Sequence, residues 1–321
     1  MSNRHTISQT SPDAQRGITV DLLNRGAAIG RIQLHGMGRQ RDIDVVLGYA
    51  STEDCALDPF YLGSTVGPVA NRIANGKVTL ASGTFSIGIN EPSRSNALHG
   101  GELGLHQQIF QPSQRSDSKS LTLSRQLPHL SDGFPGNRLV TVRYELTDAT
   151  SLQFDFAATT DRETVINLAN HAYFNLGGRL ADHEFRIHSK HFTPLNEQSI
   201  PIGTISSLVG SELDFRQWRR LGDSVLDHNF VLPKDNKLQK AASLRLHDTQ
   251  LQLDVLTSQP ALQVYTGDGL TAPFSTRAGI CLEAQAFPDA PNQPNFPSVV
   301  LTPGRTYRQR TIYRFAELSD H

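Results

Sequence analysis

The chain has 321 residues, 30 of them basic and 31 acidic, and a formal net charge of -1. This balance provides no field that would favour nucleic acid or an anionic membrane surface, so we expect neither partner. Two cysteines, Cys55 and Cys281, are too few for a disulfide framework and lack the spacing of a zinc site. The polar N-terminus has no apolar signal segment, and no run reaches the ~20 apolar residues that span a bilayer. We therefore expect a cytoplasmic protein.

The first third of the chain reads as short strands and turns. Residues 1–16 are polar and predict a flexible lead-in, followed by one domain over residues 17–321. Between residues 17 and 50, β-branched runs are broken by glycine, which is typical of strands and not of helices. Asn75-Gly76 predicts a type I′ hairpin turn.

Alternation is clearest in the middle of the chain. Val140, Val142, Tyr144 and Leu146 share one face of an extended segment, and residues 152–158 alternate in the same way. This pattern predicts two antiparallel strands joined at residues 148–150. The one short helix that the sequence suggests lies around residues 215–221. With no composition break and no repeat, we predict a single all-β domain, a large sandwich.

Two histidines stand out by their setting. His171 lies in NLANHAYFNLGG, between an apolar run and a glycine turn, and Tyr173 is on the same face if the segment is extended. His99 directly precedes two glycines in NALHGG. A histidine near its ordinary pKa of ~6.5 can donate or accept a proton at neutral pH. A lone histidine is more often a hydrogen-bonded structural residue, so the sequence around each leaves both interpretations open.

Glu283 lies between apolar neighbours in ICLEAQAF and shares a strand face with Gln285. Burying a carboxylate costs several kcal/mol unless it is paired or used, although the same residue can point to solvent from an antiparallel sheet. Gln263 and Tyr265 share a face of a strand that we expect to be its neighbour. Planar polar groups combined with aromatic rings are typical of a carbohydrate site.

Seven segments, in this order, carry a resemblance to a known family. They are NRIANG at 71–76, NALHGG at 96–101, DGFPGN at 132–137, NHAYFNLGG at 170–178, LDHNFVL at 226–232, LQVYTG at 262–267 and LEAQAFPDAPNQPNFPSVVLTPG at 282–304. From about residue 17 to residue 315 the chain resembles the aldose 1-epimerases, also called galactose mutarotases. The resemblance implies a large β-sandwich of the galactose mutarotase type with an open cleft for a free aldohexose such as galactose or glucose.

The same resemblance implies a mechanism and its residues. Glu283 is the general base that takes the proton of the C1 hydroxyl, and His171 is the general acid that protonates the ring oxygen. Activity near neutral pH then needs an ionised Glu283 and a protonated His171, so we expect the nearby carboxylate to hold the histidine pKa up. The family needs no metal or other cofactor, and we expect a monomer or homodimer. The residues implied to bind the sugar are Asn71, Arg72, His99, Asp227 and Gln263.

The chain departs from the family pattern at Pro68, where arginine is commoner, and at Asp268, where asparagine is commoner. Neither departure touches the implied acid and base, but both bear on which sugar fits. Two alternatives stay open: a sugar-binding protein of the same fold without turnover, and an epimerase of hexose 6-phosphates. The second would need a cluster of basic side chains at the cleft, where Arg72 is the only arginine that the motifs supply.

Overall fold

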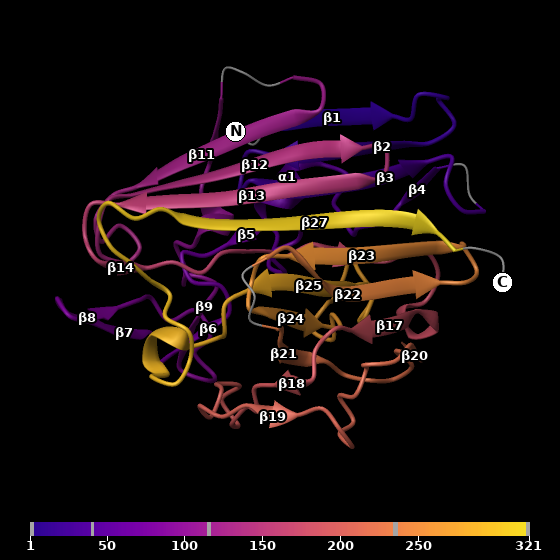
Figure 1. Cartoon of the computed structure of the whole chain (residues 1–321). Coiled ribbons are helices and arrows are strands. Elements are labelled where there is room, and N and C mark those ends of the chain that lie inside the picture. Colours follow the sequence, from indigo (N-terminus) through magenta and orange to yellow (C-terminus); the bar gives the residue numbers. More distant parts are fainter. Residues whose placement is uncertain (1–2, 40–41, 114–116, 234–236, 319–321) are drawn as a thin grey trace.

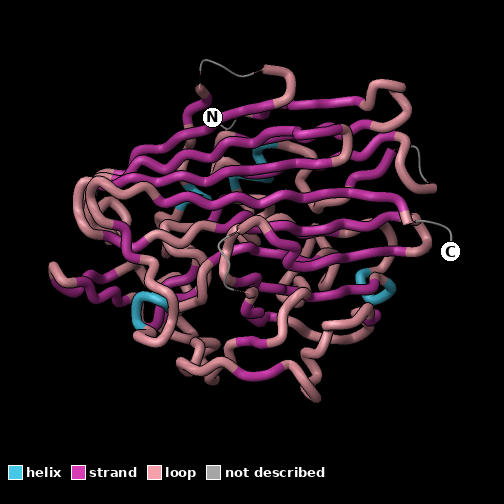
Figure 2. Tube along the Cα trace, viewed as in Figure 1, coloured by secondary structure: helices cyan, strands magenta, loops and turns pink. Residues whose placement is uncertain are grey.

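The computed structural model describes residues 3–39, 42–113, 117–233 and 237–318. Strands make up nearly all of its regular structure, with a few short helical turns between them (Figure 2). The largest sheet has nine strands in the order β10-β11-β12-β13-β27-β23-β22-β17-β20. In that order its strands are Gln111–Pro112, Ser120–Leu127, Arg138–Asp148, Ser151–Thr160, Tyr307–Glu317, Leu251–Thr257, Gln239–Leu246, Glu184–Ile187 and Arg219–Arg220.

A second sheet has six strands in the order β16-β25-β24-β21-β18-β19. Its strands are Tyr173–Phe174, Ile280–Gln285, Ala261–Tyr265, Asp227–Val231, His191–Phe192 and Ser206–Ser207. A four-stranded sheet holds β1 to β4, which are Arg4–Thr10, Gly17–Leu23, Ala28–His35 and Asp42–Asp44. Two-stranded pairs complete the fold: β5 (Thr65–Val66) with β15 (Ala169–Asn170), β6 (Arg72–Ala74) with β9 (Asn96–Leu98), β7 (Lys77–Leu80) with β8 (Gly83–Ser86), and β14 (Thr164–Val165) with β26 (Val300–Leu301).

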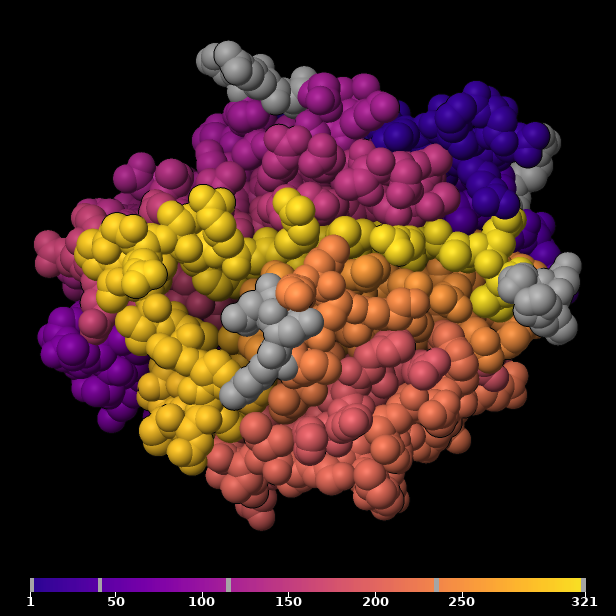
Figure 3. Space-filling model, viewed as in Figure 1, coloured from indigo at the N-terminus to yellow at the C-terminus, as the bar shows by residue number. Residues whose placement is uncertain are grey.

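The sheets pack face to face around one large core, which confirms the all-β sandwich (Figure 1). Buried side chains of β12 and β13, such as Val142 and Phe154, belong to the same apolar cluster as Leu262 of β24 and Leu282 of β25. The last long strand, β27, lies between β13 and β23, so the C-terminal segment joins the two halves of the nine-stranded sheet. Figure 3 shows it as a yellow band between earlier and later parts of the chain.

The alternating pattern of the middle strands is confirmed. Val140, Val142, Tyr144 and Leu146 are buried, whereas their neighbours along β12 are more exposed. β12 and β13 pair antiparallel across the predicted turn at residues 148–150. The buried Tyr144 hydroxyl donates to the carbonyl of Ala27 at 2.6 Å, because a phenol in an apolar core needs a partner.

Three local predictions are wrong in whole or in part. Arg4–Thr10 is a strand and not a flexible lead-in, because it pairs along its whole length with β2 and buries Ile7; residues 1 and 2 lie outside the described residues. Residues 215–221 form no helix, since Arg219–Arg220 pair with β17 at the sheet edge. Asn75 and Gly76 do take positive φ values of 53° and 57°, but β6 and β7 pair with other strands and not with each other.

The short helix α1 (Thr52–Ala56) was not expected from the sequence. It begins after Ser51, whose hydroxyl accepts the Asp54 N–H at 3.0 Å as an N-cap. Five residues are too few to show an apolar period, which is why no pattern predicts it. No helix among the described residues is long and apolar enough to cross a bilayer.

A buried ion pair stabilises the DGFPGN loop. The Arg138 guanidinium is fully buried and donates to both oxygens of Asp132, at 2.8 and 3.2 Å. It also donates to the carbonyls of Gly136 and Pro128. Each nitrogen of the guanidinium thus donates at least one hydrogen bond, and the ion pair links the start of the loop to the residue that follows it.

Asp132→Ala is expected to lower the free energy of unfolding by roughly 3 to 5 kcal/mol, because it leaves a buried guanidinium without its charge partner. Asp155→Ala is the matched control, since Asp155 pairs with Arg310 at the surface and such pairs contribute about 0 to 1 kcal/mol. Urea unfolding followed by circular dichroism measures both. Equal losses in the two variants would contradict the structural role given to the buried pair.

Candidate active site

A cleft of about 470 Å³ opens on the face of the six-stranded sheet that lies opposite the core. Along β25, Ile280, Leu282 and Ala284 belong to the core, so the alternation of the strand turns Glu283 to the cleft. Six of the residues that the sequence pointed to line this one cleft. They are Asn71, Arg72, His99, His171, Asp227 and Glu283.

The pairing of three strands places the seventh predicted residue, Gln263, beside the cleft. The strand of Gln263, β24, is the neighbour of β25, as the sequence predicted; Gln263 pairs with Glu283 and, on its other side, with Asn229 of β21. The Gln263 amide donates to Asp227 at 2.6 Å. Gln263 therefore lies next to Glu283, and its hydrogen bond holds the Asp227 carboxylate at the wall of the cleft.

His171 and Glu283 face each other. The distance from His171 Nε2 to Glu283 Oε1 is 3.8 Å, and both side chains are buried. His171 lies between β15 and β16, and its backbone is fixed by bonds to Ser64 and Gly63 at 2.9 and 3.0 Å. The ring of Tyr173 lies 5.1 Å from the His171 ring, on the expected face. The two groups are thus held close together on bonded backbone, just beyond direct hydrogen-bond distance.

His99 is held as a hydrogen-bond donor toward the cleft. Its Nδ1 accepts the backbone N–H of Asn71 at 3.1 Å, so in the neutral ring the proton is on Nε2. Its backbone has a φ of 53°, and its N–H donates back to the Asn71 carbonyl. The ring lies 5.1 Å from that of His171, nearly perpendicular to it.

This tautomer also decides whether the cluster suits a metal. In the described part of the chain, His99, His171 and Glu283 bring their ligand atoms within 4.8 Å of one another. A histidine ligand must offer an unprotonated nitrogen, and Nδ1 of His99 is taken by an N–H donor. A metal on Nε2 would move the ring proton to Nδ1 and break the bond from the Asn71 N–H. The arrangement therefore fits a hydroxyl group better than a cation.

Arg72 lies at the other end of the cleft in a network of charges. It contacts Glu91 at 3.0 Å and Asp227 at 3.4 Å, and Arg94 contacts Glu91 at 2.6 Å. Glu91 was not predicted, because it comes from a polar loop with no pattern that marks it. The carboxylates fix the direction of the Arg72 guanidinium, which lines the cleft.

The two departures from the family pattern have different positions. Asp268 lines the cleft, where it accepts the hydroxyl of Thr266. Pro68 does not line it; its carbonyl accepts the N–H of Asn167 at 2.8 Å, beside the isolated bridge between Val69 and Asn167. Only Asp268 can therefore bear directly on which sugar fits.

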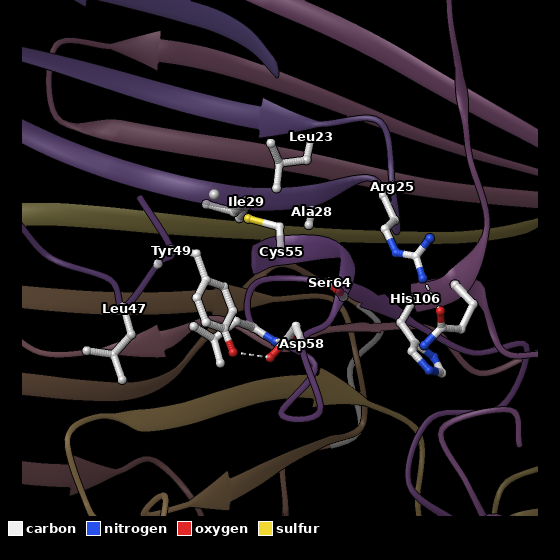
Figure 4. A pocket seen from close by; sticks show the side chains of 14 residues that line it. Leu23, Arg25, Ala28, Ile29, Leu47, Tyr49, Cys55, Asp58, Ser64 and His106 are labelled. Carbon is white, nitrogen blue, oxygen red and sulfur yellow. Dashed lines mark hydrogen bonds between the residues drawn. The ribbon is translucent and has the colours of Figure 1, made fainter. Parts of the chain in front are cut away.

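Aromatic side chains that line the cleft were only partly expected. Tyr173 and Tyr265 were recognised by their strand faces, but Phe60 and Tyr61 come from a loop after α1 and carry no sequence signal. A small crevice of about 20 Å³ lies behind this loop. Figure 4 shows it, with Tyr49 hydrogen-bonded to Asp58 and with Arg25 and His106 at its other end.

Burial dominates the protonation of His171 and Glu283. It raises the pKa of Glu283 well above its usual value, and the negative charge of Asp227 adds to this effect. It lowers the pKa of His171 to about 4, although a backbone hydrogen bond and Asp227 act in the opposite direction. The expectation of a raised histidine pKa is therefore wrong: the Asp227 carboxylate acts in that direction, but burial outweighs it. At a pH between these two pKa values, His171 and Glu283 together hold one proton.

Several buried polar atoms at the cleft and on the strands beside it lack a hydrogen-bond partner among the described residues. Glu283 Oε2, Gln263 Oε1 and Asn229 Oδ1 make no hydrogen bond. A buried acceptor without a partner is unfavourable by about 1 to 3 kcal/mol, so such atoms are commonly paired with water or a ligand. Of the three, Glu283 lines the cleft, where its free oxygen suits a hydroxyl group of a ligand.

Known proteins resemble the chain over almost its whole length. The family model described as aldose 1-epimerase matches residues 10–314. The galactose mutarotase of Bos taurus is 35% identical over 318 residues, covering 93% of this chain and 91% of the relative. The aldose 1-epimerase of Escherichia coli is 34% identical over 326 residues, covering 93% of this chain and 92% of the relative.

Solved structures agree with the sequence relatives. An aldose epimerase homologue from C. elegans aligns with a TM-score of 0.90 at 26% identity, over 99% of this chain and 100% of the other. A galactose 1-epimerase from Lactobacillus acidophilus aligns with a TM-score of 0.82, also at 26% identity and over the same shares. The chain belongs to the aldose 1-epimerase family.

Proposed function

We propose that this chain interconverts the α and β anomers of free aldohexoses such as galactose and glucose, by acid and base catalysis of ring opening and closure. The observation that carries the proposal is the pair of ionisable groups, His171 and Glu283, facing each other at 3.8 Å in the cleft. Ring opening must remove one proton and deliver another, and a pair that holds a single proton can do both.

The proposed roles follow from the positions. Glu283 takes the proton of the C1 hydroxyl and His171 protonates the ring oxygen; the open aldehyde rotates about the C1–C2 bond and closes on its other face. The ring oxygen of a sugar can only accept a hydrogen bond, so a bound sugar favours the form with the proton on His171. A bound sugar thereby opposes the order of the two pKa values that burial sets.

The other cleft residues are proposed to hold the sugar. His99 offers an N–H, Arg72 a guanidinium, and Asp227 a carboxylate fixed by Gln263. Asn71 lines the cleft next to Arg72. Positive donors near an oxygen that gains charge also stabilise the transition state.

The charge network argues against a hexose 6-phosphate as the substrate. Arg94 lines the cleft in addition to Arg72, but both guanidinium groups contact the Glu91 carboxylate, and Arg72 also contacts Asp227. A phosphate would have to displace these carboxylates. A sugar-binding protein without turnover is disfavoured by the presence of both the acid and the base.

Polarimetry of freshly dissolved α-galactose and α-glucose tests the function directly. The protein is expected to accelerate the change of optical rotation over the spontaneous rate, and EDTA is expected to leave the accelerated rate unchanged because the site needs no metal. No acceleration with either sugar would contradict the proposed activity. A rate that collapses on chelation would contradict the metal-free mechanism.

Glu283→Gln is expected to fold and bind galactose but to lose about 10²- to 10⁴-fold in kcat, a barrier increase of roughly 3 to 5 kcal/mol. Glutamine keeps the size of the side chain and a hydrogen-bonding oxygen, so only basicity is lost. Glu53→Gln, at an exposed position on α1, is the control and should match the parent. Turnover within a few-fold of the parent, in a folded variant, would remove Glu283 as the base.

The profile of kcat/KM against pH is expected to be bell-shaped, with its two limbs set by the protonation of His171 and Glu283. Activity falls at low pH when the pair gains a second proton, and because burial lowers the pKa of His171 to about 4, this limb should lie below 6.5. Activity falls at high pH when the pair loses its last proton, above the usual pKa of Glu283. The spontaneous rate is subtracted at each pH. An acid limb at or above pH 6.5 would contradict this description.

A further inference from the structure

The ring of Tyr61 lies among three histidines. Its centroid is 4.7 Å from that of His99, 4.6 Å from that of His106 and 5.7 Å from that of His171. Two of these rings belong to the cleft, and the third lies behind them beside the crevice shown in Figure 4. Tyr61 itself lines the cleft. One side chain thus contacts both histidines to which the proposed function gives a role.

The backbone that carries Tyr61 is held by one carboxylate. Asp58 accepts the N–H groups of Phe60 and Leu62, at 3.0 and 2.6 Å, on either side of Tyr61. It also accepts the Tyr49 hydroxyl at 3.0 Å. Between these two anchors Tyr61 has a φ of 60°, which a tyrosine rarely adopts without such constraint.

The loop is also tied to the segment that carries His171. The Tyr173 hydroxyl donates to the carbonyl of Phe60 at 3.2 Å, and Gly63, which follows the loop, donates to the carbonyl of His171 at 3.0 Å. The Tyr61 hydroxyl accepts from Asn90 at 3.4 Å, a weaker contact. The ring of Tyr61 is therefore better fixed through its backbone than through its hydroxyl.

Neither histidine ring is fully oriented by its own hydrogen bonds. Among the described residues, His171 has a 3.5 Å contact between Nδ1 and the Cys281 sulfur and the backbone hydrogen bond that acts on its pKa, besides the 3.8 Å approach to Glu283. In the same part of the chain, the His99 ring has one hydrogen bond, from the Asn71 N–H. Rotation of either ring would move its cleft-facing nitrogen away from a sugar, and packed rings on both sides oppose that rotation.

We propose that Tyr61 is a positioning residue of this site, whose aromatic ring, held by the Asp58 loop, fixes the orientation of the His99 and His171 rings. The proposal rests on the proposed function for its kinetic consequence but not for its structural one. The role requires the aromatic ring of Tyr61 and not its hydroxyl. Phenylalanine at this position should therefore keep the two histidine rings oriented, and a small side chain should not.

The experiment compares Tyr61→Ala, Tyr61→Leu and Tyr61→Phe with the parent in the polarimetric assay. The first two are expected to lose about 10- to 100-fold in kcat with a smaller change in KM, because a misoriented acid affects the transition state more than the bound ground state. Tyr61→Phe is expected to keep kcat within about threefold of the parent. Trp218→Ala, which removes a half-buried ring that packs on Arg245 outside the cleft, is the control and should match the parent.

Nuclear magnetic resonance of histidine labelled with 15N gives a readout that needs no activity. Ring signals of His99 and His171, assigned with His99→Gln and His171→Gln, should shift or broaden in Tyr61→Ala and stay close to the parent in Tyr61→Phe. These signals test the proposal even if the parent shows no mutarotation, an outcome that would count against the proposed function alone.

Three results would overturn the inference. A folded Tyr61→Ala with parental kcat and unchanged histidine signals would show that the ring positions nothing. A loss confined to KM would make Tyr61 a sugar contact only. A Tyr61→Phe variant as slow as Tyr61→Ala would place the effect in the hydroxyl. If Tyr61→Ala does not fold, Tyr61→Leu decides between the same outcomes.

Discussion

The site depends on a carboxylate buried in the middle of a sheet. Glu283 is 2% exposed and has one oxygen without a hydrogen-bond partner among the described residues. Burial of this kind is unfavourable by several kcal/mol, and an apolar residue would stabilise the strand better. The strand tolerates it because its opposite face is fully apolar: Ile280, Leu282 and Ala284 pack in the main core. The same burial that disfavours the charge makes the group a stronger base once it is ionised.

Paired strands and loops contribute different residues to the site because of this constraint. The proposed acid and base lie on backbone paired with other strands, where packing on two faces allows little movement. The residues around them come from loops in unusual conformations: Tyr61, Asn71 and His99 all have φ near 60°. Each such residue is unfavourable by about 1 to 2 kcal/mol unless its surroundings enforce it. Backbone hydrogen bonds between Asn71 and His99, and the Asp58 carboxylate beside Tyr61, provide that enforcement.

The sequence was most informative where a periodic pattern repeats. Alternation predicted β12 and β13, and it placed Gln263 and Glu283 on strands that were expected to be neighbours and are. It failed where tertiary contacts decide the conformation. Arg4–Thr10 is polar and was expected to be flexible, but a sheet edge needs few apolar side chains. Glu91 and Tyr61 could not be found, because their importance comes from what lies beside them in space and not from neighbours along the chain.

Protonation was the property furthest from reach of the sequence. Ordinary pKa values suggested an ionised glutamate and a histidine near neutrality, whereas burial moves the two pKa values past each other. The number of protons on the pair is nevertheless the same, one, in both descriptions. What differs is which group carries it before the sugar arrives, and this is set by solvation and not by residue identity. In the proposed mechanism, a ring oxygen that can only accept, placed against His171, then selects the reactive form from two that differ by the position of a single proton. The substrate thus completes the electrostatics of a site whose geometry is already in place.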